Sequence, residues 1–221
     1  MCRSGGWARS SAVAVEWYRS AASFNQVQRG RKERRTIASQ EKVVLNSEDV
    51  RRMLVRIAHE IVERNGDGRV AIVGIQPRGV VIAQRLRDKV AELLAADVRF
   101  GEIDISFYRD DLSLRGPEHQ PEVRETRIDF PVEEHTTVLV DDVLYTGRTV
   151  RAAIEALFAF GRPRRVQLAV VCDRGHRELP IRPDYVGKNL PTSRRERVNV
   201  RLAEVDGVDE VSISELAEVR A

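Results

Sequence analysis

The chain has 221 residues, of which 42% are hydrophobic and 32% charged, and its formal net charge is +3. This length suffices for one α/β domain with a real core, or at most two small ones. No apolar run is long enough to cross a membrane, and so small a net charge does not by itself require a nucleic-acid partner. The two cysteines, Cys2 and Cys172, lie far apart, which favours a reducing, cytoplasmic setting over a disulfide framework.

Residues 1–40 differ in composition from the rest of the chain. They are rich in Ser, Ala and Arg, show no sustained period, and carry the basic cluster Arg29–Arg35. Two interpretations are open: a basic arm that touches RNA phosphates, or a disordered N-terminal extension.

The first regular element is a helix that begins at Asn46, where a capping residue precedes acidic side chains, and ends at Asn65. Apolar residues recur at helical spacing between Val50 and Val62. His59 belongs to the opposite, polar stripe, for which a solvated helix face is the simplest interpretation.

A buried strand is predicted over 70–75, followed by Pro77, Arg78 and Gly79 and then by a second helix. A plain turn between strand and helix explains the glycine, but it does not explain the arginine beside it. A further strand is predicted over 98–107, and a polar stretch without a period runs from there to about residue 127. A loop of that length inside a compact domain is usually functional or disordered.

The most informative stretch is 137–149, TVLVDDVLYTGRT. Its apolar run predicts a buried strand that ends at Asp141 and Asp142, and a loop with Thr146 and Gly147 leads into a helix through Phe158. In an α/β sheet, ligands bind at the carboxyl ends of the strands, where this loop would lie. The glycine, the hydroxyls and the helix N-terminus suit a phosphate, while the carboxylates suit Mg²⁺ or sugar hydroxyls.

Each fragment of this motif is also explained by an ordinary capped helix. The whole ordered set instead favours a phosphorylated ribose with metal-bound phosphates. Beyond it, the sequence predicts a buried strand over 166–172, which ends in a buried free Cys172, then an Arg-containing polar segment and a closing strand over 198–205.

Residues 137–149 resemble the phosphoribosyl-pyrophosphate (PRPP) motif of type I phosphoribosyltransferases. The stretch VDDVLYTGRT is similar to that of the PyrR family, pyrimidine-operon attenuators that are also uracil phosphoribosyltransferases. The resemblance runs from about Val43 to Val211 and includes RIAHE, EIDISFYRDDL and DRGHRELPIRPDYVGKNLPTS. It implies one α/β domain over 41–221, with a mainly parallel sheet flanked by helices, the type I phosphoribosyltransferase fold. Because it begins after residue 40, we favour a disordered extension for residues 1–40.

The resemblance implies conversion of uracil and PRPP to UMP and pyrophosphate, with Mg²⁺ as the cofactor. It also implies UMP-dependent binding of pyrimidine-operon mRNA, which terminates transcription or blocks translation, and a homo-oligomer of two or more copies. Two alternatives remain: a salvage enzyme without an RNA role, and an RNA regulator whose inactive site senses nucleotide. Tyr145 stands where purine phosphoribosyltransferases place an acid, which argues against a purine substrate.

The resemblance also assigns residues. The catalytic residues are Asp141, Asp142, Arg78 and Arg109, and the two aspartates hold Mg²⁺ through water. The PRPP- and UMP-binding residues are Pro77, Arg78, Gly79, Thr137, Val138, Leu139, Val140, Asp141, Asp142, Val143, Leu144, Tyr145, Thr146, Gly147, Arg148 and Thr149. The RNA-binding residues are His59, Arg64, Arg177, Arg182 and Lys188. Val55 departs from the family pattern, which often has Thr there, and we expect the RNA residues to lie apart from the loops that hold PRPP.

Overall fold

The computed structural model describes residues 41–66, 69–106 and 125–215. Residues 1–40 and Arg109 lie outside these ranges. The elements in chain order are β1 (Lys42–Leu45), α2 (Ser47–Arg64), β2 (Val70–Ile75), α3 (Arg78–Leu94), β3 (Arg99–Ile103), β4 (Arg127–Ile128), the 3₁₀ turn η3 (Val132–Glu134), β5 (Thr136–Leu144), α4 (Arg148–Phe158), β6 (Arg165–Asp173), β7 (Tyr185–Asn189), β8 (Glu196–Arg201), α5 (Ala203–Asp206) and β9 (Glu210–Glu215).

The main sheet has six strands in the order β4-β3-β2-β5-β6-β7. All neighbouring pairs are parallel except β3 with β4. The central strand β2 is buried along its whole length, as expected for a strand covered on both faces. The prediction of an α/β fold with a mainly parallel sheet is confirmed.

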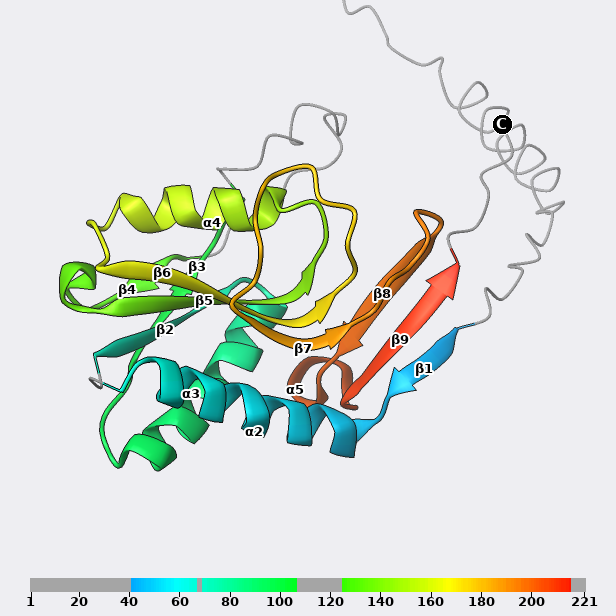
Figure 1. Ribbon diagram of the computed structural model, residues 1–221, viewed down its shortest axis with the longest axis horizontal. Helices are drawn as coiled ribbons and strands as arrows, with labels where there is room; N and C mark the ends of the chain where they lie inside the picture. Colours follow the sequence, from blue (N-terminus) through cyan, green and yellow to red (C-terminus); the bar gives the residue numbers. More distant parts are fainter. Residues whose placement is uncertain (1–40, 67–68, 107–124, 216–221) are drawn as a thin grey trace, which may run out of the picture. The chain divides into compact units, whose positions relative to one another are not determined.

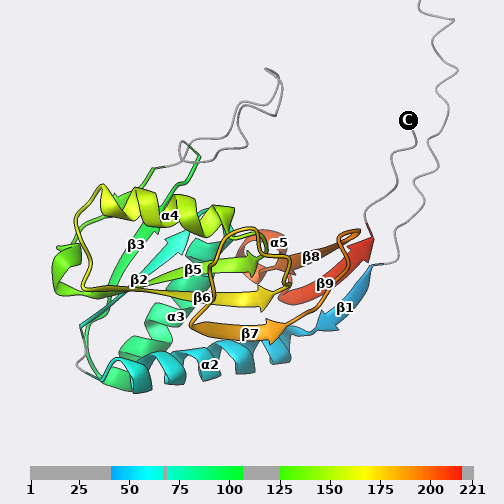
Figure 2. The ribbon, with the colours of Figure 1, turned by 45° about the horizontal axis from the view of Figure 1, so that its top comes forward.

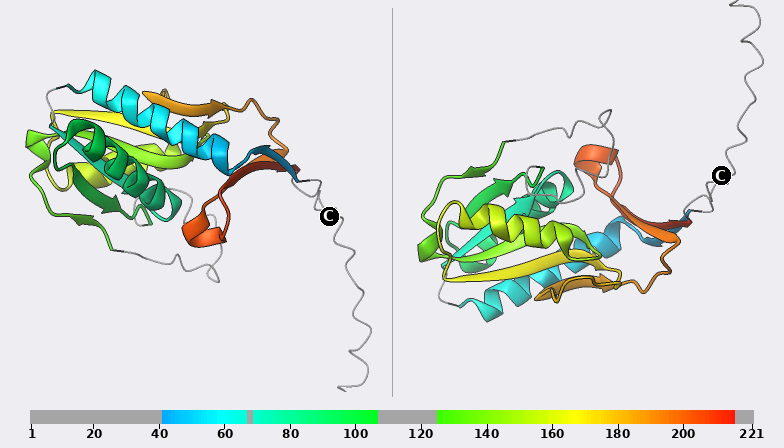
Figure 3. Two further views of the ribbon diagram at one scale, coloured as in Figure 1. Left: turned by 90° about the horizontal axis from the view of Figure 1, so that it is seen from below. Right: turned by 90° about the horizontal axis from the view of Figure 1, so that it is seen from above.

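Helices cover both faces of this sheet. α2 and α3 lie on one face and α4 lies on the other (Figures 1 and 2). Seen from below, the helices α2 and α3 stand in front of the sheet, and seen from above α4 does (Figure 3). Each face of the sheet has its own hydrophobic core, and successive residues of β5 point into different ones. Val138 packs in the core with α2 and α3, and Leu139 packs in the core with α4.

The predicted strand after residue 137 continues further than its apolar run. It does not end at the acidic pair, because β5 runs on to Leu144. Its neighbour β6 remains paired with it over this length, with Asp141 opposite Val170 and Val143 opposite Cys172. Cys172 is a buried free thiol, as predicted, and burial raises its pKa to about 12.

A second, three-stranded antiparallel sheet has the order β1-β9-β8. The prediction of one closing strand over 198–205 is wrong, since β8 ends at Arg201 and the short helix α5 follows. The Asp206 carboxylate accepts a hydrogen bond from the backbone N–H of Leu202 at 3.0 Å, which fixes this turn. Gly207, with φ of 76°, then reverses the chain into β9.

The predicted ends of α2 are confirmed. Asn46 forms a capping box with Asp49, and Asn65 caps the other end. The Asn65 side chain is buried and donates to Gln167 at 3.0 Å and to the Tyr185 hydroxyl at 3.1 Å, so it joins α2 to β6 and β7. Within the described ranges, no helix has both the length and the apolar character needed to span a bilayer.

Candidate active site

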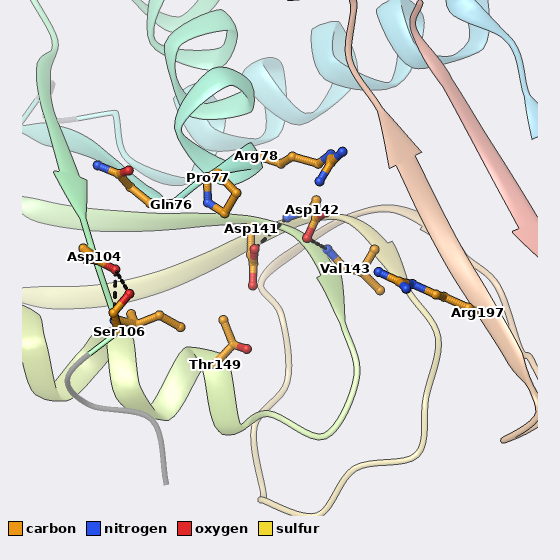
Figure 4. A pocket seen from close by; sticks show the side chains of 11 residues that line it. Gln76, Pro77, Arg78, Asp104, Ser106, Asp141, Asp142, Val143, Thr149 and Arg197 are labelled. Carbon is orange, nitrogen blue, oxygen red and sulfur yellow. Dashed lines mark hydrogen bonds between the residues drawn. The ribbon is translucent and has the colours of Figure 1, made fainter. Parts of the chain in front are cut away.

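A pocket of about 400 Å³ lies where β2, β3 and β5 end (Figure 4). The side chains that line it are Gln76, Pro77, Arg78, Asp104, Ile105, Ser106, Asp141, Asp142, Val143, Thr149 and Arg197. Parallel strands bring their carboxyl ends to one edge, so segments far apart in the sequence meet here. The structure therefore brings together Pro77, Arg78 and the acidic pair, which the sequence had placed in two separate motifs.

The acidic pair is held in place by the backbone that follows it. One oxygen of Asp141 accepts from the N–H of Asp142 at 2.9 Å, and one oxygen of Asp142 accepts from the N–H of Val143 at 2.7 Å. Burial raises the pKa of Asp142 above its ordinary range, although the Val143 N–H and the charge of Arg78 act in the opposite direction. A cation bound beside Asp142 would therefore stabilise the charged form of this carboxyl.

The segment between β2 and α3 contributes Arg78 from the first turn of the helix. The peptide Gln76–Pro77 is cis. Arg78 forms an ion pair with Asp206 at 2.9 Å, and its Nε is buried without a hydrogen-bond partner in the described residues. A guanidinium with an unused buried donor, at the N-terminus of a helix, suits an anion in the pocket.

Gly79 allows close packing between α3 and β5. A Cβ atom at Gly79 would lie 2.4 Å from the carbonyl oxygen of Val140, so only glycine allows α3 to approach β5 this closely. The approach brings the N-terminus of α3 next to the acidic pair, which directly follows Val140.

The segment between β5 and α4 has the form expected of a phosphate loop. Gly147, with φ of 94°, precedes the first turn of α4, and Thr149 in that turn reaches the pocket. The carbonyl oxygen of Thr146 accepts from the N–H groups of Glu178 and Leu179 at 3.0 and 3.1 Å. Arg148 is exposed and forms an ion pair with Glu178 at 2.8 Å, so both contacts join this loop to the segment after β6.

The remaining residues of the predicted PRPP motif are buried in the protein or pack against its other side chains. Val138, Leu139, Val140 and Leu144 are buried in the two cores, and Thr137 is fully buried, with no hydrogen-bond partner for its hydroxyl in the described part of the chain. Tyr145 lies under the guanidinium of Arg174, which is 4.1 Å from the ring centroid. These residues form the strand and loop that present the acidic pair and Thr149.

Arg177 lies close to the phosphate loop. Its guanidinium donates to the carbonyl oxygen of Tyr145 at 2.8 Å, to that of Ile181 at 3.0 Å and to the carboxylate of Asp173 at 2.5 Å. The expectation that Arg177 lies apart from the loops that hold PRPP is therefore wrong. Sequence spacing could not reveal this contact, because the loop after β6 folds back over the loop after β5.

The other predicted RNA residues lie on α2 and in or near β7. Arg56 donates to the carbonyl oxygens of Val186 and Gly187, both at 2.8 Å, which fixes α2 beside β7. His59 on α2 and Lys188 on β7 are exposed, as is Arg182 before β7. Arg64 forms an ion pair with Asp184 at 2.9 Å and lies over the Tyr185 ring.

Sequence reasoning missed several pocket residues: Gln76, Asp104, Ser106 and Arg197. Asp104 directly follows the last residue of β3, where the rule for parallel sheets places ligands, and its carboxylate accepts from the Ser106 hydroxyl at 2.7 Å. Arg197 comes from β8 in the second sheet, and no local pattern in the sequence indicates that this sheet reaches the pocket.

The oxygen donors of the pocket fit Mg²⁺. Asp141 and Asp142 present carboxylate oxygens, which are the ligands that hard cations prefer. No cluster of three or more metal-ligating side chains occurs in the residues that the structure describes. A site with few protein ligands fits an ion that keeps water and substrate oxygens around it, as Mg²⁺ does beside phosphates.

Fold and site together define a phosphoribosyltransferase of type I. The family described as "Phosphoribosyl transferase domain" matches residues 43–204. The fold is similar to that of a hypoxanthine-guanine phosphoribosyltransferase from Bacillus anthracis, with a TM-score of 0.59, 16% identity, and coverage of 79% of this chain and 98% of that chain. The hypoxanthine phosphoribosyltransferase of Trypanosoma cruzi gives a TM-score of 0.59 at 17% identity, over 80% and 97% of the two chains.

Much nearer relatives carry the name "Bifunctional protein PyrR". The protein of that name from Chloroflexus aurantiacus is 58% identical over 174 residues, which are 78% of this chain and 94% of the relative. The one from Pelotomaculum thermopropionicum is 54% identical over 183 residues, 82% of this chain and all of the relative. The chain belongs to the PyrR family.

Proposed function

We propose that this protein is a uracil phosphoribosyltransferase, which converts uracil and PRPP to UMP and pyrophosphate. The observation that carries the proposal is the convergence of Asp141, Asp142, Arg78 and Thr149 on one pocket at the carboxyl edge of the sheet. These groups match the parts of PRPP: two carboxylates for the ribose hydroxyls, a cation for pyrophosphate, and a hydroxyl at a helix N-terminus for the 5′-phosphate.

The mechanism follows from this placement. Asp141 and Asp142 orient the ribose, the N-terminus of α4 with Thr149 holds the 5′-phosphate, and Arg78 neutralises charge that develops on the departing pyrophosphate. Positioning and fixed charges of this kind account for most of the acceleration in such transfers. When bound, Mg²⁺ supplies further positive charge beside the phosphates, and the acidic pair is placed to hold it through water. Arg109 is proposed to contact pyrophosphate from the segment between β3 and β4.

We propose a second function, the UMP-dependent binding of pyrimidine-operon mRNA. It is supported by the family membership, by the word "bifunctional" in the relatives' names, and by the exposed basic residues on and beside α2 and β7. His59, Arg182 and Lys188 are exposed there, and Arg64 lies on the same helix as His59. Residues of this type contact RNA phosphates and unstacked bases. The resemblance also supports a cytoplasmic homo-oligomer of two or more copies.

Two assays test both functions, one on a double variant and one on the wild-type protein. The double variant D141N/D142N should keep its fold but lose uracil-dependent PRPP turnover by orders of magnitude. Normal turnover in this variant would refute the assignment of the acidic pair. The wild-type protein should bind a pyrimidine-operon stem-loop more tightly when UMP is added. Turnover without RNA binding would identify a salvage enzyme, whereas RNA binding without turnover would identify a regulator with an inactive site.

A further inference from the structure

The second sheet contributes a cation to the catalytic pocket. Along β8 the valines Val198 and Val200 are buried, while Arg197 is exposed and lines the pocket. Arg197 also lines an adjoining cavity of about 270 Å³, which shares Arg78 and Asp142 with the catalytic pocket. The two cavities thus meet at a place where two arginines flank one carboxylate.

Among the residues that the structure describes, Arg197 differs from its neighbours in having no counter-ion. Arg78 forms an ion pair with Asp206, and Arg201 forms ion pairs with Glu41 and Glu210. Within the described ranges, no hydrogen bond or ion pair involves the Arg197 side chain. It points from β8 toward Asp142 and Val143 (Figure 4). A guanidinium that is held at a pocket without a protein partner is available to a ligand.

The proposed function, on which this inference rests, already assigns part of the pocket. Thr149 and the N-terminus of α4 serve the 5′-phosphate, Arg78 serves pyrophosphate, and the acidic pair serves the ribose. Uracil is the reactant that has no side chain assigned to it. Arg197 is the cation among the lining residues that remain, which are Gln76, Asp104, Ile105, Ser106, Val143 and Arg197.

Uracil needs a cation because of how it reacts. The N1–C1′ bond forms while the C1′–O bond to pyrophosphate breaks, and the electron pair of that bond leaves with pyrophosphate. The N1 proton passes to water, and during the transfer negative charge spreads to the carbonyl oxygens of the ring. We propose that Arg197 donates hydrogen bonds to a uracil carbonyl oxygen and stabilises this charge, which makes it a further catalytic residue.

The test compares two bases in one variant. R197Q should lower kcat with uracil about 10²-fold, as the loss of one donor to a developing oxyanion does, while the KM for PRPP stays nearly unchanged. With 5-fluorouracil, whose ring is more acidic and needs less stabilisation, the loss should be clearly smaller. R197K, which keeps the charge, should restore part of the rate. The matched control R165Q removes an exposed arginine at the opposite end of β6 and should match the wild type with both bases.

The outcomes separate this inference from the function on which it rests. Equal losses with uracil and 5-fluorouracil would overturn it, since a merely structural role does not depend on the acidity of the base. Wild-type rates in R197Q would overturn it as well, while leaving the uracil phosphoribosyltransferase intact. Absence of uracil turnover in the wild-type protein would overturn the proposed function together with the inference.

Discussion

Arg177 donates a hydrogen bond to the carbonyl oxygen of Tyr145 at 2.8 Å and so joins the loop after β6 to the loop after β5. The same guanidinium holds the carboxylate of Asp173 at the end of β6. A residue that the family resemblance assigns to RNA is therefore also part of the scaffold of the nucleotide pocket. Its substitution should affect both functions.

The variant R177A should lower the free energy of unfolding by about 2 kcal/mol, because a partly buried charged donor is lost and Asp173 is left without its partner. Turnover should fall too, since the Tyr145 carbonyl is no longer held beside the phosphate loop. Urea unfolding and steady-state kinetics measure the two effects. The exposed Arg194 in R194A provides the control. Wild-type stability and turnover in R177A would show that these hydrogen bonds contribute nothing.

Asp142 should make stability depend on pH. Burial raises its pKa in the folded protein above that in the unfolded chain, so its contribution to stability is full below the unfolded-state pKa and is lost as pH rises through the folded-state pKa. The variant D142N should therefore gain stability relative to the wild type between about pH 4 and pH 7. Urea unfolding at both values measures this difference, with D88N at an exposed site as the control. A difference independent of pH would contradict the raised pKa.

The exposed basic residues on and beside α2 and β7, which are His59, Arg182 and Lys188, should bind RNA without taking part in turnover. The double variant H59A/K188A removes two exposed basic side chains that lie outside the catalytic pocket. UMP-dependent RNA affinity should fall, and the salt dependence should lose about one unit of slope for each phosphate contact removed. Uracil turnover should stay at the wild-type value. R99A, at the start of β3, is the control, and an unchanged RNA affinity at every salt concentration would favour a plain salvage enzyme.

The deletion of residues 1–40 should leave the domain intact. The family match begins at residue 43 and the first strand at Lys42. The shortened chain should melt within about 3 °C of the full chain and should turn over uracil at the same rate. A larger drop in melting temperature would mean that this segment packs against the domain.

The sequence predicted the central elements well, because each has a strong local signature. The capping box and the apolar stripe of α2, the buried strand β2 and the strand-loop-helix order around the acidic pair all follow from neighbouring residues. The second sheet was harder to predict. β1 has four residues and pairs with β9 at the other end of the chain, so no local period specifies it. The apolar residues around Leu202 continue a strand pattern, and the turn becomes visible through hydrogen bonds in the structure, such as that from the Leu202 N–H to the Asp206 carboxylate.

The difference between local and long-range signals also explains which residues of the candidate site could be predicted. Two local motifs, one around Arg78 and one that holds the acidic pair and Thr149, identified these residues, which the structure then places around one pocket. Asp104 and Arg197 reach it from strands that have no motif of their own. Contacts between distant loops, such as that of Arg177 with Tyr145, follow from three-dimensional folding and leave no spacing signal in the sequence.

The pairing of β1 with β9 has a consequence for the nascent chain. β1 leaves the ribosome early, but Ile213 of its partner strand β9 is synthesised some 170 residues later. By then β2, α3 and β5 can already pack against one another. During translation the parallel sheet can therefore assemble before the antiparallel one exists. Arg197, which lines the pocket, and Asp206, which pairs with Arg78, are made last. An incomplete chain therefore carries the acidic pair and Arg78 but lacks the part of the pocket that β8 forms.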